Sequence, residues 1–282
     1  MKYLLSYMIL WTCCINLTFM TVNSNGITDN LDSGIVNGRE AKEGEFPWMV
    51  ALYLNGTFAC SSTLISPTIV MTAAHCVQFE DGIPPATSFY GIVGNINREG
   101  PETRIQFQEV VAHPQFDANQ SLDNDIAILR MCSPLEMDKW IQPICLPQDD
   151  RAFDIETVQT MGWGSIYIRR NDVAEYMTTT ELSILPRHTC KEIFAKHKDI
   201  NITNKNICVY SQKPTGLCYG DSGSPAVYND PDSGKPVAIG VASFISYYGC
   251  FIPKAPRVYT MIASYINWIK ETVGDHNDIC FV

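Results

Sequence analysis

A serine, a histidine and an aspartate, each inside a short motif, could together form an activated nucleophile. His75 follows Thr-Ala-Ala, Asp125 precedes Ile-Ala, and Ser222 lies in Gly-Asp-Ser-Gly. A serine hydroxyl is a weak nucleophile at neutral pH and needs a neighbouring base, for which histidine, titrating at about 6.5, is suited. The histidine in turn needs a carboxylate that holds its tautomer and stabilises the imidazolium. The three motifs together therefore predict a serine nucleophile.

Each motif taken alone also has a structural interpretation. A histidine beside a cysteine is often structural, an aspartate before an apolar run often belongs to a turn, and Gly-Asp-Ser-Gly occurs in ordinary loops. In the order His75, Asp125, Ser222, however, the motifs and their flanks resemble the chymotrypsin family of serine proteases. The resemblance runs from Ile35 almost to the C-terminus, and its other motifs are Ile35-Val36-Asn37-Gly38, Phe46-Pro47-Trp48, Gly162-Trp163-Gly164 and Pro256-Arg257-Val258-Tyr259.

The resemblance implies an all-β fold of two six-stranded antiparallel β-barrels with the active site between them. His75 and Asp125 would come from the first barrel and Ser222 from the second. Ser222 would attack the scissile carbonyl, and the backbone N–H groups of Gly220 and Ser222 would form the oxyanion hole. The implied activity is hydrolysis of protein or peptide substrates, with protein inhibitors as possible partners and no cofactor. A catalytically silent homologue that binds proteins through the same cleft is the alternative.

The elements that must position these residues are mostly short strands. The segments that are short, rich in β-branched or aromatic residues and bounded by turn residues are 48–54, 68–72, 105–112, 126–129 and 237–244. Many short strands of this kind indicate a sandwich or barrel. Only the end of the chain has a clear helical stripe, formed by Ile262, Tyr265, Ile266, Ile269 and Val273. We therefore expect a β body closed by a C-terminal helix.

The composition excludes some classes of function. The 282 residues are 46% hydrophobic and 18% charged, which is ordinary for a folded globular chain. The net charge of -10 argues against nucleic acid as a partner, because nucleic-acid affinity depends on clustered Lys and Arg.

The N-terminus predicts export. A basic start, the mostly apolar run 3–20 and small residues after it match a signal peptide over residues 1–24. A membrane anchor is the alternative, but Ser6, Thr12 and Asn16 interrupt the run, which is short for a span. The expected organisation is a signal peptide at 1–24, a propeptide at 25–34 and a protease domain at 35–282, in a secreted protein that does not bind a membrane.

The cysteines predict disulfides. Eleven are present, and Cys13 and Cys14 lie in the predicted signal peptide. Cysteine-rich exported chains usually contain disulfides. The resemblance implies the pairs Cys60–Cys76, Cys190–Cys208 and Cys218–Cys250, and leaves Cys132, Cys145 and Cys280 open. The glycosylation acceptors are Asn55, Asn119 and Asn201. We expect no metal, because Asn95 stands where calcium-binding relatives have a carboxylate.

The activation site departs from the family pattern. In the family the precursor is cut just before the residue equivalent to Ile35, and the new ammonium pairs with the aspartate before the nucleophile, here Asp221. The residue before the cut is usually Arg or Lys, but here it is Gly34. A trypsin-like activator is therefore not expected. Either a protease of another specificity makes the cut, or the chain stays a zymogen-like binding protein.

The specificity pocket also departs from trypsin. The resemblance implies a pocket formed by Gly216, Leu217, Ser243, Phe244, Ile245 and Arg257. Gly216 at the base offers no charge to a lysine or arginine, so cleavage after basic residues is not expected. Bulky Leu217 and Ile245 favour small aliphatic side chains. An uncompensated charge on Arg257 would be costly, so it needs a carboxylate as partner. This partner would be either an acidic side chain of the substrate, as in granzyme B, or an internal Asp or Glu. Small aliphatic and acidic specificity both remain open.

Overall fold

The computed structural model describes residues 38–101, 103–116, 122–148, 155–165, 172–196, 200–246, 249–250, 252–274 and 278–282. The predicted signal peptide, the predicted propeptide, Ile35 and Asn119 lie outside these residues. Within them, no helix has the length and apolar character needed to cross a bilayer.

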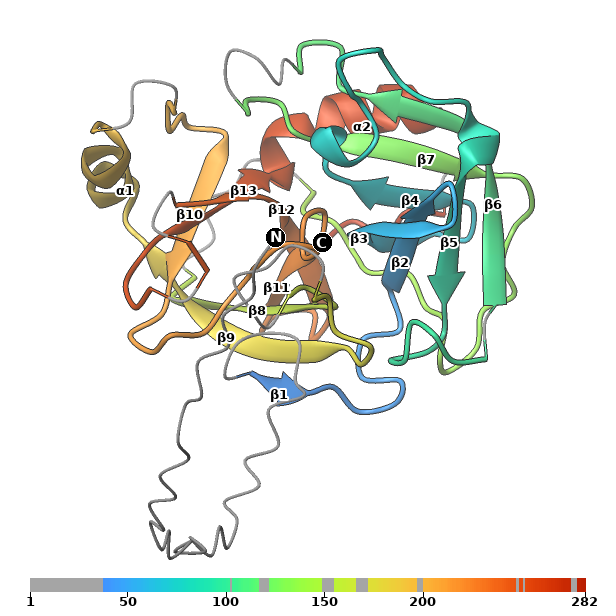
Figure 1. The fold of residues 1–282 in the computed structure, drawn as a ribbon, viewed down its shortest axis with the longest axis horizontal. Helices are drawn as coiled ribbons and strands as arrows, with labels where there is room; N and C mark the ends of the chain where they lie inside the picture. Colours follow the sequence, from blue (N-terminus) through green and yellow to red (C-terminus); the bar gives the residue numbers. More distant parts are fainter. Residues whose placement is uncertain are drawn as a thin grey trace, which may run out of the picture. The chain divides into compact units, whose positions relative to one another are not determined.

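The first barrel is built from the N-terminal strands and occupies the right half of Figure 1. Its strands are β2 (Met49–Leu54), β3 (Thr57–Ser66), β4 (Ile69–Thr72), β5 (Phe89–Val93), β6 (Thr103–Ala112) and β7 (Ala127–Met131). They close in the order β2-β3-β4-β7-β6-β5, with antiparallel pairing throughout. In β6, Ile105 and Phe107 are buried whereas Arg104 and Gln106 are exposed, as expected for a strand with one face in the core.

The second barrel uses the later strands. These are β8 (Thr157–Gly162), β9 (Thr178–Leu185), β10 (Asn206–Tyr210), β11 (Pro225–Asn229), β12 (Pro236–Ile245) and β13 (Arg257–Met261). Their order is β9-β10-β13-β12-β11-β8, and antiparallel pairing of β8 with β9 closes the ring. The short β1 (Arg39–Glu40) adds to β9 from outside the ring. The predicted fold of two six-stranded antiparallel barrels is therefore confirmed.

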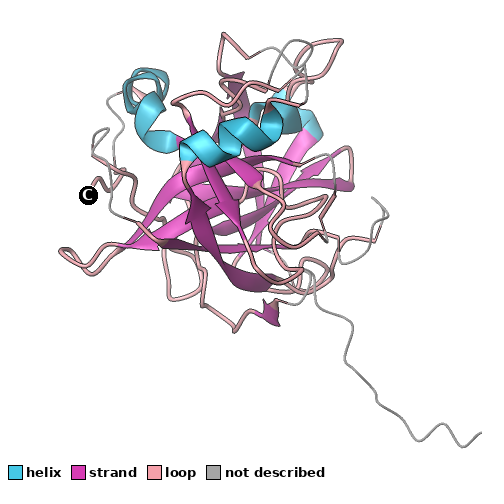
Figure 2. Ribbon diagram, turned by 90° about the vertical axis from the view of Figure 1, so that its left-hand side faces the viewer, coloured by secondary structure: helices cyan, strands magenta, loops and turns pink. Residues whose placement is uncertain are grey.

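The helices lie on one side of the strands (Figure 2). The predicted C-terminal helix is α2 (Ile266–Val273), preceded by the 3-10 turn η3 (Ile262–Tyr265). Helix α1 (Arg187–Phe194) was not predicted. Only Cys190 and Phe194 of its eight residues are buried, and two residues are too few to reveal a helical period in the sequence. Two further 3-10 turns are η1 (Ala74–Cys76) and η2 (Ala86–Ser88).

The disulfides include the three pairs that the resemblance implied and one more. The structure contains Cys60–Cys76, Cys190–Cys208 and Cys218–Cys250, and it also joins Cys145 to Cys280. Of the described cysteines, Cys132 is free and exposed. The tail also pairs by backbone hydrogen bonds, since Leu146 N–H donates to the Cys280 carbonyl at 2.8 Å. The C-terminus is thus fixed against the segment that follows Cys145.

Candidate active site

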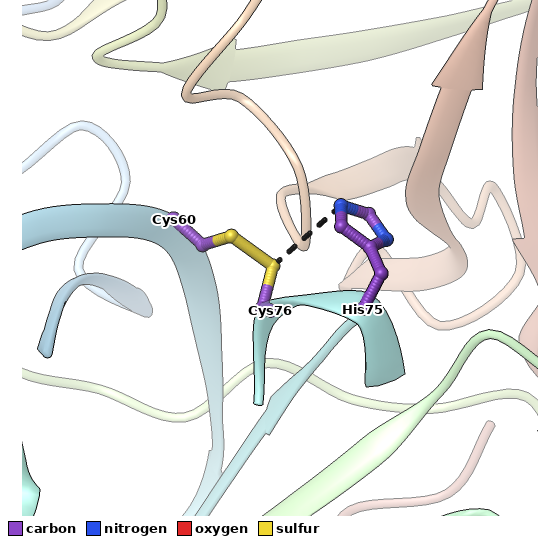
Figure 3. Close-up of side chains that lie close together, drawn as sticks. All are labelled: Cys60, His75 and Cys76. Carbon is purple, nitrogen blue, oxygen red and sulfur yellow. Dashed lines mark hydrogen bonds between the residues drawn. A yellow bond between two sulfur atoms is a disulfide. The ribbon is translucent and has the colours of Figure 1, made fainter. Parts of the chain in front are cut away.

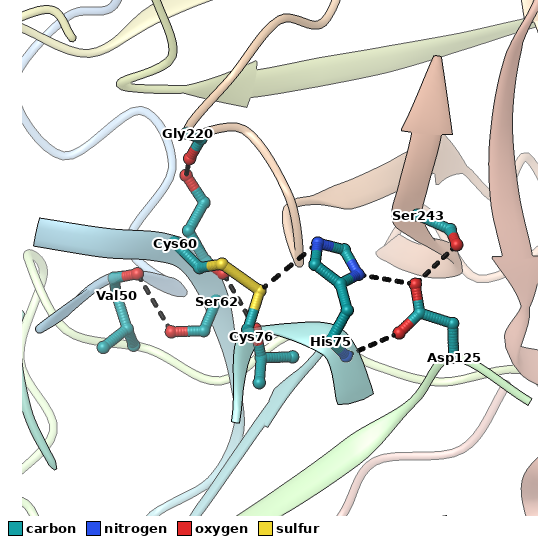
Figure 4. Close-up of a disulfide and its surroundings, with 10 residues drawn as sticks. Val50, Cys60, Ser62, His75, Cys76, Asp125, Gly220 and Ser243 are labelled. Atoms are coloured by element: carbon teal, nitrogen blue, oxygen red, sulfur yellow. Dashed lines mark hydrogen bonds and ion pairs between the residues drawn. A yellow bond between two sulfur atoms is a disulfide. The ribbon is translucent and has the colours of Figure 1, made fainter. Parts of the chain in front are cut away.

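Strand pairing brings His75 and Asp125 together. His75 lies in η1 directly after β4, and Asp125 lies shortly before β7, where Thr72 pairs with Ala127. His75 Nδ1 is 2.7 Å from Asp125 Oδ2, and the His75 backbone N–H donates to Oδ1 at 2.9 Å (Figure 4). The carboxylate therefore holds both the ring and the backbone of the histidine.

The second barrel completes the surroundings of this carboxylate. Asp125 is fully buried, and the Ser243 hydroxyl of β12 donates to its Oδ2 at 2.5 Å. The hydroxyl of Thr260 in β13 donates to the Asp125 carbonyl at 2.9 Å. Burial acts to raise the pKa of Asp125, but the charge and hydrogen bonds of His75, with Ser243, outweigh it and lower the pKa. The carboxylate is therefore kept ionised beside the ring.

The pKa of His75 moves in the opposite direction. Burial of the ring favours the neutral form, but the charge of Asp125 and its hydrogen bond outweigh that effect and raise the pKa. With Nδ1 engaged by Asp125, Nε2 is the nitrogen left for proton transfer. A raised pKa makes the ring a better proton acceptor during a reaction.

Ser222 lies on the turn that leads into β11, held by a close contact between the barrels. Gly223 has φ +82°, and a Cβ on it would come within 2.1 Å of the Thr72 hydroxyl and 2.2 Å of the Ser61 carbonyl. Only glycine fits such an approach with positive φ. This packing sets Ser222 on the wall of a cleft of about 670 Å³ that His75 also lines.

The ring nitrogen Nε2 of His75 is not bonded to Ser222 in this state. It lies 3.9 Å from Cys76 Sγ (Figure 3), and among the described residues no hydrogen bond joins it to the serine hydroxyl. Contacts of this kind are often long without substrate and tighten when it binds. The structure therefore brings both groups to one cleft without forming their bond.

Gly220 and Asp221 precede the serine. Gly220 has φ +97°, and its carbonyl accepts hydrogen bonds from both the N–H and the hydroxyl of Ser61, each at 3.1 Å. Asp221 is fully buried and accepts the N–H groups of Gly164 at 2.8 Å and Cys218 at 2.9 Å. A Cβ on Gly164 would lie 2.1 Å from an Asp221 oxygen, so this glycine makes room for the carboxyl group.

Burial dominates the titration of Asp221. It raises the pKa to about 7, and the two backbone hydrogen bonds and the more distant charge of Arg257 only partly oppose it. The described residues place no cation within ion-pair distance of this carboxyl group. Among the described residues, two backbone N–H groups stabilise the charged form of Asp221, but no cation pairs with it.

Arg257 packs on Gly216, the residue expected at the base of the specificity pocket. A Cβ on Gly216 would lie 2.4 Å from Nε and 2.6 Å from Cζ of Arg257. Nη1 donates to the Ala255 carbonyl at 3.0 Å and Nη2 to the Cys250 carbonyl at 2.6 Å, while Nε has no partner within the described part of the chain. The side chain is 1% exposed, and burial lowers its pKa. The hydrogen bonds of Arg257 thus go to backbone carbonyls, while the charge of the internal Asp221 acts on it from a greater distance.

The other pocket residues face the cleft. Those that line it are Leu217, Ser243, Phe244 and Ile245, whereas Gly216 and Arg257 are buried and do not line it. The exposed lining of the cleft is largely apolar.

A second network next to Asp125 was not predicted. Asn124 has φ +58°, and its Oδ1 accepts from Lys205 Nζ at 2.8 Å and from the Tyr265 hydroxyl at 3.1 Å. Its amide donates to the Gln115 carbonyl at 3.1 Å. The available sequence signal was an asparagine directly before the aspartate, because asparagine tolerates positive φ better than most residues. Lys205 and Tyr265 are too distant in sequence to have been associated with it.

One group of possible metal ligands occurs in the described residues. Atoms of Cys60, His75 and Cys76 lie within 4.8 Å of one another (Figure 3). The two sulfurs are joined in a disulfide, and it is a thiolate that binds metal. With both cysteines in this disulfide, the group offers no thiolate to a metal.

Comparison with known proteins agrees with this geometry. The family model described as "Trypsin" matches residues 35–269. The chain is 29% identical over 248 residues to the "Clotting factor G beta subunit" of Tachypleus tridentatus, covering 84% of this chain and 79% of that protein. It is 29% identical over 261 residues to "Phenoloxidase-activating factor 3" of Holotrichia diomphalia, covering 86% and 73%.

A third relative is much longer. The chain is 31% identical over 251 residues to the "Suppressor of tumorigenicity 14 protein homolog" of Bos taurus, covering 86% of this chain but only 28% of that protein. The chain thus spans roughly a quarter of that relative's length. With two antiparallel barrels, a His–Asp pair from the first and a serine turn from the second, and a family match over most of its length, the chain belongs to the trypsin family of serine proteases.

Proposed function

We propose that the chain is a secreted serine endopeptidase with His75, Asp125 and Ser222 as its catalytic triad. The observation that carries the proposal is the His75–Asp125 hydrogen bond on the wall of the cleft that Ser222 also lines. The first barrel supplies His75 and Asp125 and the second supplies Ser222, so the cleft that these residues line is where the reaction would occur.

The chemistry follows from the contacts. Ser222 attacks the scissile carbonyl while His75 takes its proton on Nε2, since Nδ1 is engaged by Asp125. The N–H groups of Gly220 and Ser222 stabilise the oxyanion. His75 then gives the proton to the leaving amine, and an acyl-enzyme remains on Ser222. A water molecule, activated by His75, hydrolyses this ester and frees the serine.

Activation would follow a cut before Ile35 that places its ammonium beside Asp221. The raised pKa of this buried carboxyl group supports the proposal, because the described residues place no cation within ion-pair distance of its charged form. Gly34 excludes an activator that cuts after Lys or Arg. Four disulfides support export to an oxidising compartment, and Asn55 and Asn201 are exposed, as glycosylation requires.

For specificity, we infer cleavage after small aliphatic residues. Leu217 and Ile245 wall a pocket whose base is filled by the Arg257 side chain. The backbone carbonyls that hold both terminal nitrogens of Arg257 support this over acidic specificity.

Replacing Arg257 with glycine is expected to deepen the pocket. We expect kcat/KM for peptides with Phe or Tyr before the scissile bond to rise at least about tenfold relative to peptides with Ala or Val, because a pocket gains about 1–3 kcal/mol of selectivity per added methylene it can hold. Arg257→Met is the matched control, since it keeps the volume and removes the charge. If wild type cleaves after Asp or Glu and Arg257→Met abolishes that cleavage, Arg257 binds anions and the aliphatic assignment is wrong.

A fluorophosphonate probe combined with N-terminal sequencing tests the enzyme itself. Labelling of Ser222 in a secreted chain that begins at Ile35 is the expected result, and a panel of peptide substrates should show little cleavage after Lys or Arg. A chain that begins at Ile35 but is not labelled would instead be a silent homologue that binds proteins.

A further inference from the structure

Asp125 lies at the centre of a tight three-residue turn. The Ile126 N–H donates to the Asn124 carbonyl at 2.8 Å, so the chain bends sharply at the carboxylate. Asn124 has φ +58°, in the left-handed region that residues with a side chain seldom occupy. Such a backbone keeps its shape only where the surrounding structure holds it. The direction of the Asp125 side chain therefore depends on what holds Asn124.

Three hydrogen bonds hold the Asn124 side chain. Its Oδ1 accepts from Lys205 Nζ at 2.8 Å and from the Tyr265 hydroxyl at 3.1 Å, and its Nδ2 donates to the Gln115 carbonyl at 3.1 Å. Of these three partners only the Lys205 ammonium is charged, and hydrogen bonds with a charged partner are roughly twice as strong as neutral ones. Lys205 therefore makes the strongest of the three contacts.

Lys205 reaches Asn124 from the other barrel. It directly precedes β10 of the second barrel, whereas Asn124 lies in the first-barrel loop before β7. The Lys205 backbone is fixed there, because its carbonyl accepts the Met261 N–H at 2.7 Å and its N–H donates to the Thr203 hydroxyl at 3.2 Å. Its ammonium also lies 5.4 Å from the centroid of the Tyr265 ring. The lysine thus connects the second barrel to the residue before Asp125.

This contact complements those made to Asp125 itself. The Ser243 hydroxyl donates to the carboxylate and the Thr260 hydroxyl to the backbone carbonyl, whereas Lys205 acts on the preceding residue. Among the described residues, no carboxylate lies within ion-pair distance of Lys205. Its ammonium is therefore available to Asn124 without competition from a neighbouring acid.

We propose that Lys205 is a positioning residue for catalysis: through Asn124 it holds Asp125 in the orientation that His75 requires. The inference rests on the proposed endopeptidase function and deepens it. Misplacing a catalytic group by about 1 Å can cost about 100-fold in rate, so a small shift of the turn is enough to matter. Lys205 does not line the cleft that His75 and Ser222 share. Its loss should therefore lower kcat and leave KM nearly unchanged.

Lys205→Met tests the proposal, because it removes the ammonium and keeps an unbranched apolar stem. With active sites counted by fluorophosphonate titration, we expect kcat per active site to fall at least about tenfold and KM to stay within about twofold. The low-field proton resonance of His75 Nδ1 should also shift, since it reports the hydrogen bond to Asp125. Lys205→Arg keeps a charged donor and should recover part of the loss. A purely structural role would change the number of active sites but neither kcat per site nor the resonance.

Two further variants connect the effect to Asn124. Lys270→Met is the matched control: Lys270 Nζ also lies over an aromatic ring, 4.6 Å from the Phe281 centroid, but it is not among the partners of the Asn124 side chain. Its kcat should stay close to that of wild type. Asn124→Gly completes a double-mutant cycle, because glycine adopts positive φ without strain and has no Oδ1. In this background Lys205→Met should lower kcat less than about twofold.

The outcomes separate the two proposals. If the unsubstituted chain cleaves no peptide and the probe does not label Ser222, the endopeptidase function fails. If wild type is active but Lys205→Met keeps its kcat per site, or loses as much kcat in the Asn124→Gly background as in wild type, Lys205 does not position the triad. Should Lys205→Met fail to fold, Lys205→Gln decides by the same measurements, because its amide is one atom shorter than the ammonium stem and carries no charge; a normal kcat there overturns the proposal.

Discussion

Replacing Asp125 with asparagine is expected to lower kcat for peptide hydrolysis about 10,000-fold. The carboxylate accepts hydrogen bonds from His75 Nδ1, from the His75 backbone and from Ser243. An asparagine amide that donates toward Nδ1 selects the tautomer with its proton on Nε2, which cannot accept the proton of Ser222. Steady-state kinetics and the rate of fluorophosphonate labelling measure the loss.

Asp123→Asn is the matched control, because it makes the same chemical change two residues away. Asp123 accepts a hydrogen bond from the Thr203 hydroxyl at 3.2 Å and lies outside the proposed triad. Its activity should stay close to that of wild type. A similar loss in both variants would mean that the loop is sensitive to any substitution, and near-normal activity in Asp125→Asn would remove Asp125 from the triad.

The second large effect concerns Asp221, whose replacement by asparagine should act differently before and after the proposed cut. In the cut protein, Asp221→Asn would leave the Ile35 ammonium of the proposed pair without its counter-charge. Breaking a buried pair costs about 3–5 kcal/mol, so we expect the activity to fall at least about 100-fold at pH 7. The active form of the unsubstituted enzyme should also be lost as the pH rises well above about 8, where a terminal amine loses its charge.

In the uncut chain the same residue should set a pH dependence of stability. Burial raises the folded-state pKa of Asp221 from 3.8 to about 7, so the folded chain holds the proton more tightly than the unfolded chain. This stabilisation is complete below pH 3.8 and is lost as pH rises through 7, by an amount on the order of 4 kcal/mol. Asp221→Asn should flatten that decline.

Denaturant unfolding of the uncut chain between pH 4 and pH 8 measures this effect. Asp230→Asn, a substitution of another buried aspartate whose Oδ2 accepts the Ser233 N–H at 2.8 Å, should keep the decline. If the decline of stability with rising pH persists unchanged in Asp221→Asn, another group causes it, and the titration of Asp221 does not support the proposed pairing with a cation.

The motifs around His75, Asp125 and Ser222 predicted the barrels because they carried a family resemblance. Independently, short segments rich in β-branched or aromatic residues and bounded by turn residues indicated an all-β body. The five segments expected as strands correspond to β2, β4, β6, β7 and β12, with boundaries that differ by at most two residues. These segments are visible in the sequence because β-branched and aromatic residues gather in them and turn residues bound them. Helix α1 was missed because one buried pair gives no period.

What the sequence could not predict depends on contacts between distant segments. Ser243 was expected as a pocket wall, and its hydrogen bond to Asp125 depends on the meeting of the two barrels. The choice between an internal carboxylate and an acidic substrate for Arg257 could not be made, because backbone carbonyls are present at every residue and carry no sequence signal. The partner of Cys145 could not be predicted either, because Cys280 is 135 residues away in the sequence.

The Cys145–Cys280 disulfide has a consequence for how activation would end. Residues 25–34 contain no cysteine, and Cys145 is already bonded to the tail. A segment tethered to the enzyme would remain at an effective concentration in the millimolar range and could keep rebinding. An untethered segment dilutes into its surroundings once it is cut. The proposed activation would therefore be irreversible, because the removed segment would not stay attached to the enzyme and could not rebind at a high effective concentration.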